Sequence, residues 1–243
     1  MFKLALDAGH GINTGGKRCL KSLDPNETRE WTLNNRVADY IEEYLKVYEG
    51  YSVIRLDDKD DGKDDVPLAT RTAKANAWGA DFYLSVHHNA GINGGSGGGI
   101  MAFSHPNASK VSVEWRDQLY DALIASTGLK GNRASPKATY NFHVLRETQM
   151  PAVLVELGFM DSKTDVPIIL TGEFARACAK AMVEVIAKRG GLKKKNASTA
   201  TASTSTSGKL YRVQVGAFSN KDNAARLAEE LRSKGYQTII KEE

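Results

Sequence analysis

Along residues 1–189, short apolar runs alternate with helical patterns. The runs are LALDA, YSVIRL, DFYLSV, GIMAF and AVLVEL, and nearly continuous apolar runs of this length are typical of strands buried on both faces. Apolar residues at three- and four-residue spacing predict helices between them, over 33–45, through Ala77, over about 108–126 and over about 173–188. The alternation predicts an α/β fold with a mostly parallel, twisted sheet and helices on both faces.

The pattern changes abruptly after Arg189. Residues 196–207 contain only Asn, Ala, Ser and Thr, and a segment without large apolar side chains cannot offset the entropy lost on ordering. We therefore predict a flexible linker over 190–208, which separates a domain at 1–189 from a small unit at 209–243.

The small unit has the pattern of one strand–helix–strand repeat. LYRVQVGAF and YQTII alternate like strands, and the helical segment between them begins near Ser219 and Asp222 and ends at Gly235. Two strands and one helix have too small a core for comfortable independent stability. We therefore expect this C-terminal βαβ unit to need another copy of itself or a missing second half.

Composition places the chain among globular proteins. Of its 243 residues, 41% are hydrophobic and 26% are charged, close to the average for folded domains. Cys19 and Cys178 lie far apart, which excludes a disulfide framework and suits a reducing compartment, and we expect Cys19 at the surface. The sequence shows neither about 18 consecutive apolar residues nor the apolar region of a signal peptide. We therefore expect a protein made in the cytoplasm that has no membrane partner.

Charge is distributed unevenly, which bears on the choice of partner. Residues 1–189 carry 23 basic and 24 acidic side chains, whereas the last 54 residues carry 10 and 5. The basic excess is thus confined to the tail, and the main domain lacks the broad cationic surface that binds a phosphate backbone. Nucleic acid is therefore not an expected partner.

Polar residues capable of chemistry follow three of the predicted strands. They are His10 in DAGHG, His87 in HHN, and Glu156 within AVLVELGF, while Glu30 begins a predicted helix. The carboxyl ends of parallel strands meet at one edge of a sheet. Two imidazoles, a carboxylate at a helix start and a second carboxylate in an apolar setting have the composition of a catalytic zinc site.

Each of these residues also has a structural interpretation. His10 can be a hydrogen-bonded residue of a turn, and Glu30 can be a charge that favours a helix start. Glu156 is the strongest single candidate because an ionised carboxylate in an apolar run is costly unless it is paired or used. His143 and Arg146, in NFHVLRE, are expected to line the cleft.

Four segments in order resemble the zinc-dependent N-acetylmuramoyl-L-alanine amidases of the family called Amidase_3. They are LDAGHG, Glu30 with Asn34, ADFYLSVHHNA, and HVLRETQMPAVLVELGFMDS, and the resemblance covers residues 1–189. It implies that His10, Glu30 and His87 bind Zn²⁺ and that Glu156 is the catalytic glutamate. We also expect Asn89, His143 and Arg146 to contact substrate. The family pattern of Ser, Ile or Val, His, any residue and Asn selects His87 over His88. Glu27 is the alternative to Glu30 as the third metal ligand. Met101 occupies a position where the family often has Glu.

The tail resembles half of a SPOR domain. YRVQVGAFSNKDNAARLAEEL matches the first of the two repeats of such domains, which bind peptidoglycan. The resemblance implies that residues 209–243 bind the cell wall and that two copies of the half-domain can associate. The alternative interpretation is that the basic tail only keeps the protein soluble.

The expected activity is hydrolysis of the amide between N-acetylmuramic acid and the L-alanine of the stem peptide in bacterial peptidoglycan, by zinc-activated water with a glutamate acid/base. Two alternatives are a zinc peptidase acting within the stem peptide and a wall-binding protein whose active site has decayed. Without an export signal, the enzyme is expected to reach the wall after lysis of the producing cell. Both a phage endolysin and a bacterial enzyme that opens the mother cell after sporulation fit this expectation.

Overall fold

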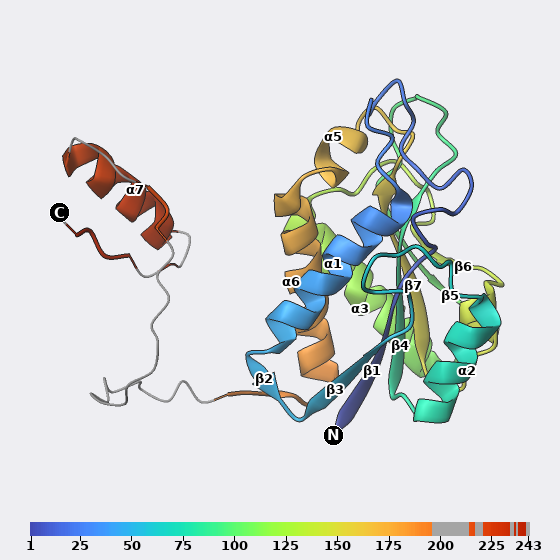
Figure 1. Ribbon diagram of the computed structural model, residues 1–243. Coiled ribbons are helices and arrows are strands. Elements are labelled where there is room, and N and C mark those ends of the chain that lie inside the picture. Colours follow the sequence, from blue (N-terminus) through green and yellow to red (C-terminus); the bar gives the residue numbers. More distant parts are fainter. Residues whose placement is uncertain (196–213, 217–220, 234–235, 237, 242–243) are drawn as a thin grey trace. The chain divides into compact units, whose positions relative to one another are not determined.

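The computed structural model describes residues 1–195, 214–216, 221–233, 236 and 238–241 (Figure 1). The chain forms two compact units, Met1–Asn196 and Ala197–Glu243. Of the helices in the described residues, none is both long and apolar enough to cross a membrane.

The first unit is built on a six-stranded sheet. Its strand order is β3-β1-β4-β7-β5-β6, and β3, β1, β4 and β7 run parallel. Strand β5 is antiparallel to β7 and parallel to β6, because residues 90–99 between β4 and β5 form no crossover helix of the kind that parallel neighbours require. The prediction of a mostly parallel sheet is confirmed. The strands are β1 (Phe2–Ala8), β3 (Tyr51–Arg55), β4 (Phe82–Asn89), β5 (Ile100–Ser104), β6 (Lys137–Thr139) and β7 (Ala152–Phe159).

Helices cover both faces of this sheet, as predicted (Figure 1). On one face, α1 (Glu30–Leu45), α3 (Lys110–Thr127) and α6 (Gly172–Arg189) pack against one another and the sheet, with α5 (Val166–Ile169) beside α6 and β7. On the other face lie α2 (Leu68–Trp78) and α4 (His143–Arg146). Strands β2 (Tyr48–Glu49) and β8 (Lys193–Lys194) form a separate antiparallel pair.

Strand alternation divides the interior into two cores. Leu4 and Leu6 of β1 belong to the larger core beneath α1, α3 and α6, whereas Ala5 points into the smaller core beneath α2 and α4. Cys19 was expected at the surface, but only 1% of it is exposed and it packs into the larger core. The expectation was wrong because the loop that carries Cys19 folds back, with its backbone N–H donating to the Thr28 carbonyl at 2.8 Å.

The second unit contains α7 (Lys221–Ser233), which confirms the predicted tail helix. The expected βαβ unit is not seen in full. The structure assigns no strand to the described residues on either side of α7, namely 214–216, 236 and 238–241. The rest of the two predicted strands, and the linker from residue 196 on, lie outside the described residues.

Candidate metal centre

The candidate residues meet at the edge of the sheet where β1, β4 and β7 end. These strands are neighbours, and their loops gather at the top of the view in Figure 1. His10 follows β1, His87 lies near the end of β4, and Glu156 lies in β7. Glu30 comes from a helix, as the first residue of α1.

His10, Glu30 and His87 form a compact set of potential ligands. One donor atom from each residue lies within 4.8 Å of the donors of the other two. Glu30 is central, with Oε2 at 3.4 Å from His10 Nε2 and Oε1 at 3.0 Å from His87 Nδ1. Glu27, the competing carboxylate, instead pairs with Arg18 at 3.2 Å. The structure therefore brings Glu30, and not Glu27, to the histidines.

The turn after β1 holds His10 in an uncommon backbone conformation. Its φ of 66° lies in the left-handed region, where a non-glycine residue needs support from its surroundings. Arg71 gives that support, since its guanidinium donates to the carbonyls of Ala8 and His10, both at 2.9 Å. Gly9 is required for space, because a Cβ there would lie 2.0 Å from His87 Cε1.

Electrostatics keeps two of the three ligands, His10 and Glu30, in their metal-binding protonation states, whereas His87, despite its burial, has a pKa raised by the hydrogen bond with Glu30 and the nearby carboxylates. Burial lowers the pKa of His10 to about 4, so its imidazole is neutral at neutral pH. Burial alone would raise the pKa of Glu30, but the hydrogen bond with His87 and the charges of His87, His10 and Lys17 outweigh it and lower the pKa to about 2. A neutral imidazole and a carboxylate are the forms that bind a metal.

The donor set fits zinc. Two imidazoles and one carboxylate are a common catalytic arrangement for Zn²⁺, which leaves a fourth position for water or substrate. Glu30 Oε2 is buried and makes no hydrogen bond to the described residues, although His10 Nε2 and Lys17 Nζ lie 3.4 and 3.7 Å from it. A buried oxygen without a hydrogen bond is costly unless a cation or water completes it. The chemistry of these residues therefore matches a divalent cation at this position.

Glu156 lies beside His87 as its in-register partner on the neighbouring strand, and neighbouring strands of a sheet are about 4.8 Å apart. Its Oε2 is also buried without a hydrogen-bond partner among the described residues. Burial raises the pKa of Glu156 to about 8; the Glu30 charge adds to the rise, and the His87 charge opposes it. A cation bound by the triad would lower this pKa. Glu156 can therefore exchange protons near neutral pH.

The adjacent histidine, His88, points to the opposite face of β4. It is buried, and its Nδ1 is 2.8 Å from Asn34 Oδ1 on α1. Burial lowers the pKa of His88 to about 3, so it is a neutral, hydrogen-bonded residue. Asn34 also donates to the Gly9 carbonyl at 3.1 Å, which ties α1 to the turn that carries His10.

The three residues expected to contact substrate have local partners. Asn89 Oδ1 accepts from the Ala90 amide at 2.8 Å, and His143 Nε2 lies 3.4 Å from the Thr72 hydroxyl on α2. Arg146 pairs with Glu147 at 2.7 Å and donates to an oxygen of Asn141. Their contact with substrate stays a prediction.

Sequence reasoning missed two residues, one beside the ligand set and one that supports the loop after β4. The Lys17 ammonium lies 3.7 Å from Glu30 Oε2. Asp161 accepts hydrogen bonds from three successive backbone amides of the glycine-rich loop, at residues 91–93, at 2.7–2.8 Å. Strand and helix periodicity gives no signal for contacts of this kind, because Asp161 and the three loop amides are separated by 68–70 positions in the sequence.

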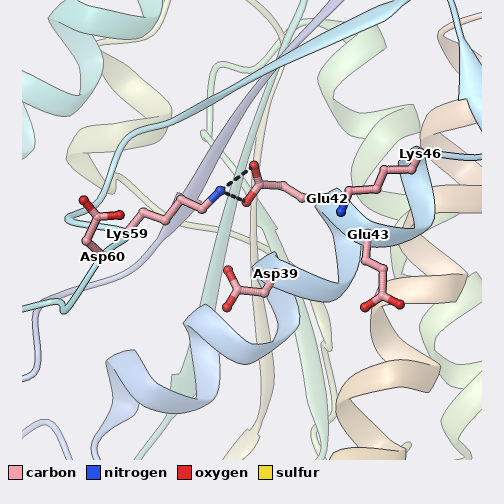
Figure 2. Close-up of a pocket in the computed structure, with 6 residues that line it drawn as sticks. All are labelled: Asp39, Glu42, Glu43, Lys46, Lys59 and Asp60. Atoms are coloured by element: carbon pink, nitrogen blue, oxygen red, sulfur yellow. Dashed lines mark hydrogen bonds and ion pairs between the residues drawn. The ribbon is translucent and has the colours of Figure 1, made fainter. Parts of the chain in front are cut away.

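A shallow hollow on α1 and the loop after β3 is separate from this site (Figure 2). Figure 2 shows Lys59 pointing to Glu42, with its Nζ 2.9 Å from Oε2. Neither the triad nor Glu156 lines the hollow, whose polar groups are charged side chains on the surface. It is lined by Asp39, Glu42, Glu43, Lys46, Lys59 and Asp60.

Comparison with known proteins links both units to cell-wall proteins. The family model for N-acetylmuramoyl-L-alanine amidases matches residues 4–188, and the SPOR-domain model matches residues 172–242. The chain is 34% identical over 241 residues to a sporulation-specific N-acetylmuramoyl-L-alanine amidase of Bacillus subtilis, covering 99% of this chain and 84% of that protein.

Two further similarities point the same way. An endolysin of Bacillus phage SPP1 is 30% identical over 201 residues, which covers 82% of this chain and 70% of the endolysin. The catalytic domain of CwlV, an N-acetylmuramoyl-L-alanine amidase from Bacillus (Paenibacillus) polymyxa var. colistinus, has a similar structure. Its TM-score is 0.68 at 25% identity, with 79% of this chain and 100% of that chain covered.

Proposed function

The chain belongs to the N-acetylmuramoyl-L-alanine amidase family and is a peptidoglycan amidase, and from this premise we propose how its residues act. His10, Glu30 and His87 hold a zinc ion, and Glu156 is the general acid/base. The bond cleaved is the amide between the lactyl group of N-acetylmuramic acid and the L-alanine of the stem peptide.

One observation carries this proposal. The donor atoms of the three proposed ligands lie within 4.8 Å of one another, and Glu156 is the in-register neighbour of His87 on the next strand. A general acid/base must lie within hydrogen-bond reach of the reacting water or one water beyond it. Glu156, with a carboxylate oxygen that has no partner among the described residues, has the position and the free acceptor that this role needs.

When bound, Zn²⁺ supplies a Lewis acid that makes water nucleophilic near neutral pH and polarises the scissile carbonyl. Glu156 accepts a proton from the attacking water as the oxygen–carbon bond forms. It then donates that proton to the alanine nitrogen as the carbon–nitrogen bond breaks, which leaves a lactyl carboxylate and a free amino terminus. The buried setting of Glu156 suits this shuttle because it raises the pKa of the carboxyl to about 8 before a cation is bound.

The tail supplies the binding part of the proposal. We assign residues 1–189 to catalysis, 190–208 to a linker and 209–243 to peptidoglycan binding, supported by the SPOR match. That match begins at residue 172, within α6, whose apolar face belongs to the core of the catalytic unit. Residues 172–189 therefore serve the catalytic fold, and self-association through residues 209–243 remains part of the proposal.

The relatives support action on the cell wall. One is named for sporulation and another is a phage endolysin, so both origins stay open for this chain. In either case we propose that the enzyme meets its substrate after lysis of the producing cell.

Product analysis tests the proposed reaction. Purified full-length protein is incubated with a defined muropeptide, with and without a chelator. We expect a new amino terminus on alanine, no new reducing sugar ends, and loss of activity with chelator that zinc restores. A new amino terminus on any later residue would show a stem-peptide peptidase, and the absence of product with retained wall binding would show a wall-binding protein. Either result would overturn the proposal.

A further inference from the structure

A second polar cluster lies directly behind the metal centre, on the α2 side of the sheet. Asp7, Arg71, Tyr83 and Ser85 are each at most 1% exposed. Tyr83, Ser85 and His87 alternate along β4, so they share a face, and Asp7 of β1 is the in-register neighbour of Ser85. The cluster therefore forms a continuous row that ends at a proposed zinc ligand.

Every contact in this row is short. His87 Nε2 lies 3.1 Å from the Ser85 hydroxyl oxygen, and that hydroxyl donates to Asp7 Oδ2 at 2.7 Å. Asp7 Oδ2 also accepts from the Tyr83 hydroxyl at 3.1 Å, and its Oδ1 accepts from Arg71 at 2.5 Å. Asp7 therefore accepts three hydrogen bonds. It can donate none, because its ion pair with Arg71 keeps the carboxylate ionised.

Counting protons along the row determines the tautomer of His87. A serine hydroxyl has a single proton, and Ser85 gives it to Asp7. The Ser85 oxygen can therefore only accept from His87, so His87 Nε2 must carry a proton. Without a cation, the other ring nitrogen also faces an acceptor, the ionised Glu30 carboxylate, and can donate a proton to it; a cation held by Glu30 would displace that proton, leave the proton on Nε2 in place, and bind at Nδ1. That atom lies 3.0 Å from Glu30 Oε1, on the side of the proposed zinc position.

We propose that Ser85, held by Asp7, is the positioning residue that fixes the tautomer and ring orientation of His87, so that Nδ1 binds the metal. The proposal rests on the metal-binding role of His87 proposed above. It assigns a function to two polar residues whose burial would otherwise be costly. Partners behind a metal ligand of this kind typically account for 10–100-fold in metal affinity.

The first test needs neither metal nor activity. Nitrogen NMR of the metal-free wild-type protein, followed as the pH is raised until the His87 ring is neutral, should show that the remaining proton stays on Nε2 and that Nδ1 is bare. In Ser85→Ala the ring loses its acceptor, and a mixture of tautomers is expected. A neutral wild-type His87 ring with its proton on Nδ1 would overturn the proposal, whether or not the protein binds zinc.

Zinc affinity, measured by competition with a chromophoric chelator, is the second test. Ser85→Ala should bind zinc about 10–100-fold more weakly than wild type. Ser104→Ala is the matched control, because Ser104 is a fully buried strand serine whose hydroxyl accepts from Arg116 at 3.2 Å, away from His87. It removes a buried hydroxyl hydrogen bond without touching the row. Thermal unfolding of the metal-free variants verifies that both are folded.

The outcomes separate this inference from the proposed function. Equal zinc affinity in Ser85→Ala and Ser104→Ala would overturn the positioning role while leaving His87 as a ligand. A wild-type protein that binds no zinc would overturn the proposed metal centre, and the NMR measurement would still decide whether Ser85 sets the tautomer.

Discussion

Replacing Glu156 with Gln should nearly abolish turnover without removing the metal. The substitution keeps the size and shape of the side chain but removes proton exchange at the carboxyl. A positioned general acid/base contributes about 10²–10⁴-fold, so hydrolysis of a defined muropeptide should fall at least about 100-fold. The zinc content of the purified protein should stay unchanged, because Glu156 is not one of the three clustered ligands.

The same substitution should stabilise the metal-free protein near neutral pH. Burial raises the pKa of Glu156 from 4.5 to about 8, so the folded protein keeps a proton that the unfolded chain has released. The free energy of unfolding of the wild type therefore falls as the pH rises from about 4.5 to about 8 and levels off above that range. Near pH 7 the penalty is about 3 kcal/mol, since each pKa unit corresponds to about 1.4 kcal/mol.

Urea unfolding in chelator at several values between about pH 5 and 8 measures this penalty. The difference between Glu156→Gln and wild type should grow with pH in favour of the variant. Glu49→Gln is the control, because it removes an exposed carboxyl on β2. Stability curves that run parallel across the pH range would refute the burial argument, and retention of more than about a tenth of wild-type turnover would refute the catalytic one.

Further changes test the support of the site and the role of the tail. Gly9→Ala places a Cβ 2.0 Å from His87 Cε1, so it should cost about 1–3 kcal/mol of stability in calorimetry and weaken zinc binding in a titration. Gly15→Ala is the control, because a Cβ there would meet nothing within 4 Å; neither stability nor zinc binding should change. Asp161→Ala removes the acceptor of three loop amides and should cost at least about 2 kcal/mol in urea unfolding, with faster amide exchange in the loop; unchanged exchange would contradict its role. Removal of residues 196–243 keeps the β2–β8 pair and should leave turnover of soluble muropeptides unchanged while weakening sedimentation with purified cell walls; equal sedimentation would contradict wall binding by the tail.

The local sequence was sufficient to predict the helices and strands and the types of residue that form the site. Apolar runs and three- and four-residue spacing predicted strands such as β4 and helices such as α6, because burial of side chains imposes these periods on any chain. The polar residues at strand ends could be selected in the same way, since His10, His87 and Glu156 interrupt apolar runs where a parallel sheet gathers its functional groups.

Only the tertiary structure decided which of these groups meet. It placed Glu30 rather than Glu27 between the histidines, reversed β5 beside β7, and joined Asp7 to Ser85 behind His87. Asp7 and Ser85 are separated by 78 positions, and their contact depends on β1 and β4 being neighbours in the sheet. Periodicity reports which face of an element is buried, but strand order and register come from long-range packing, and these determine the distances on which the chemistry depends.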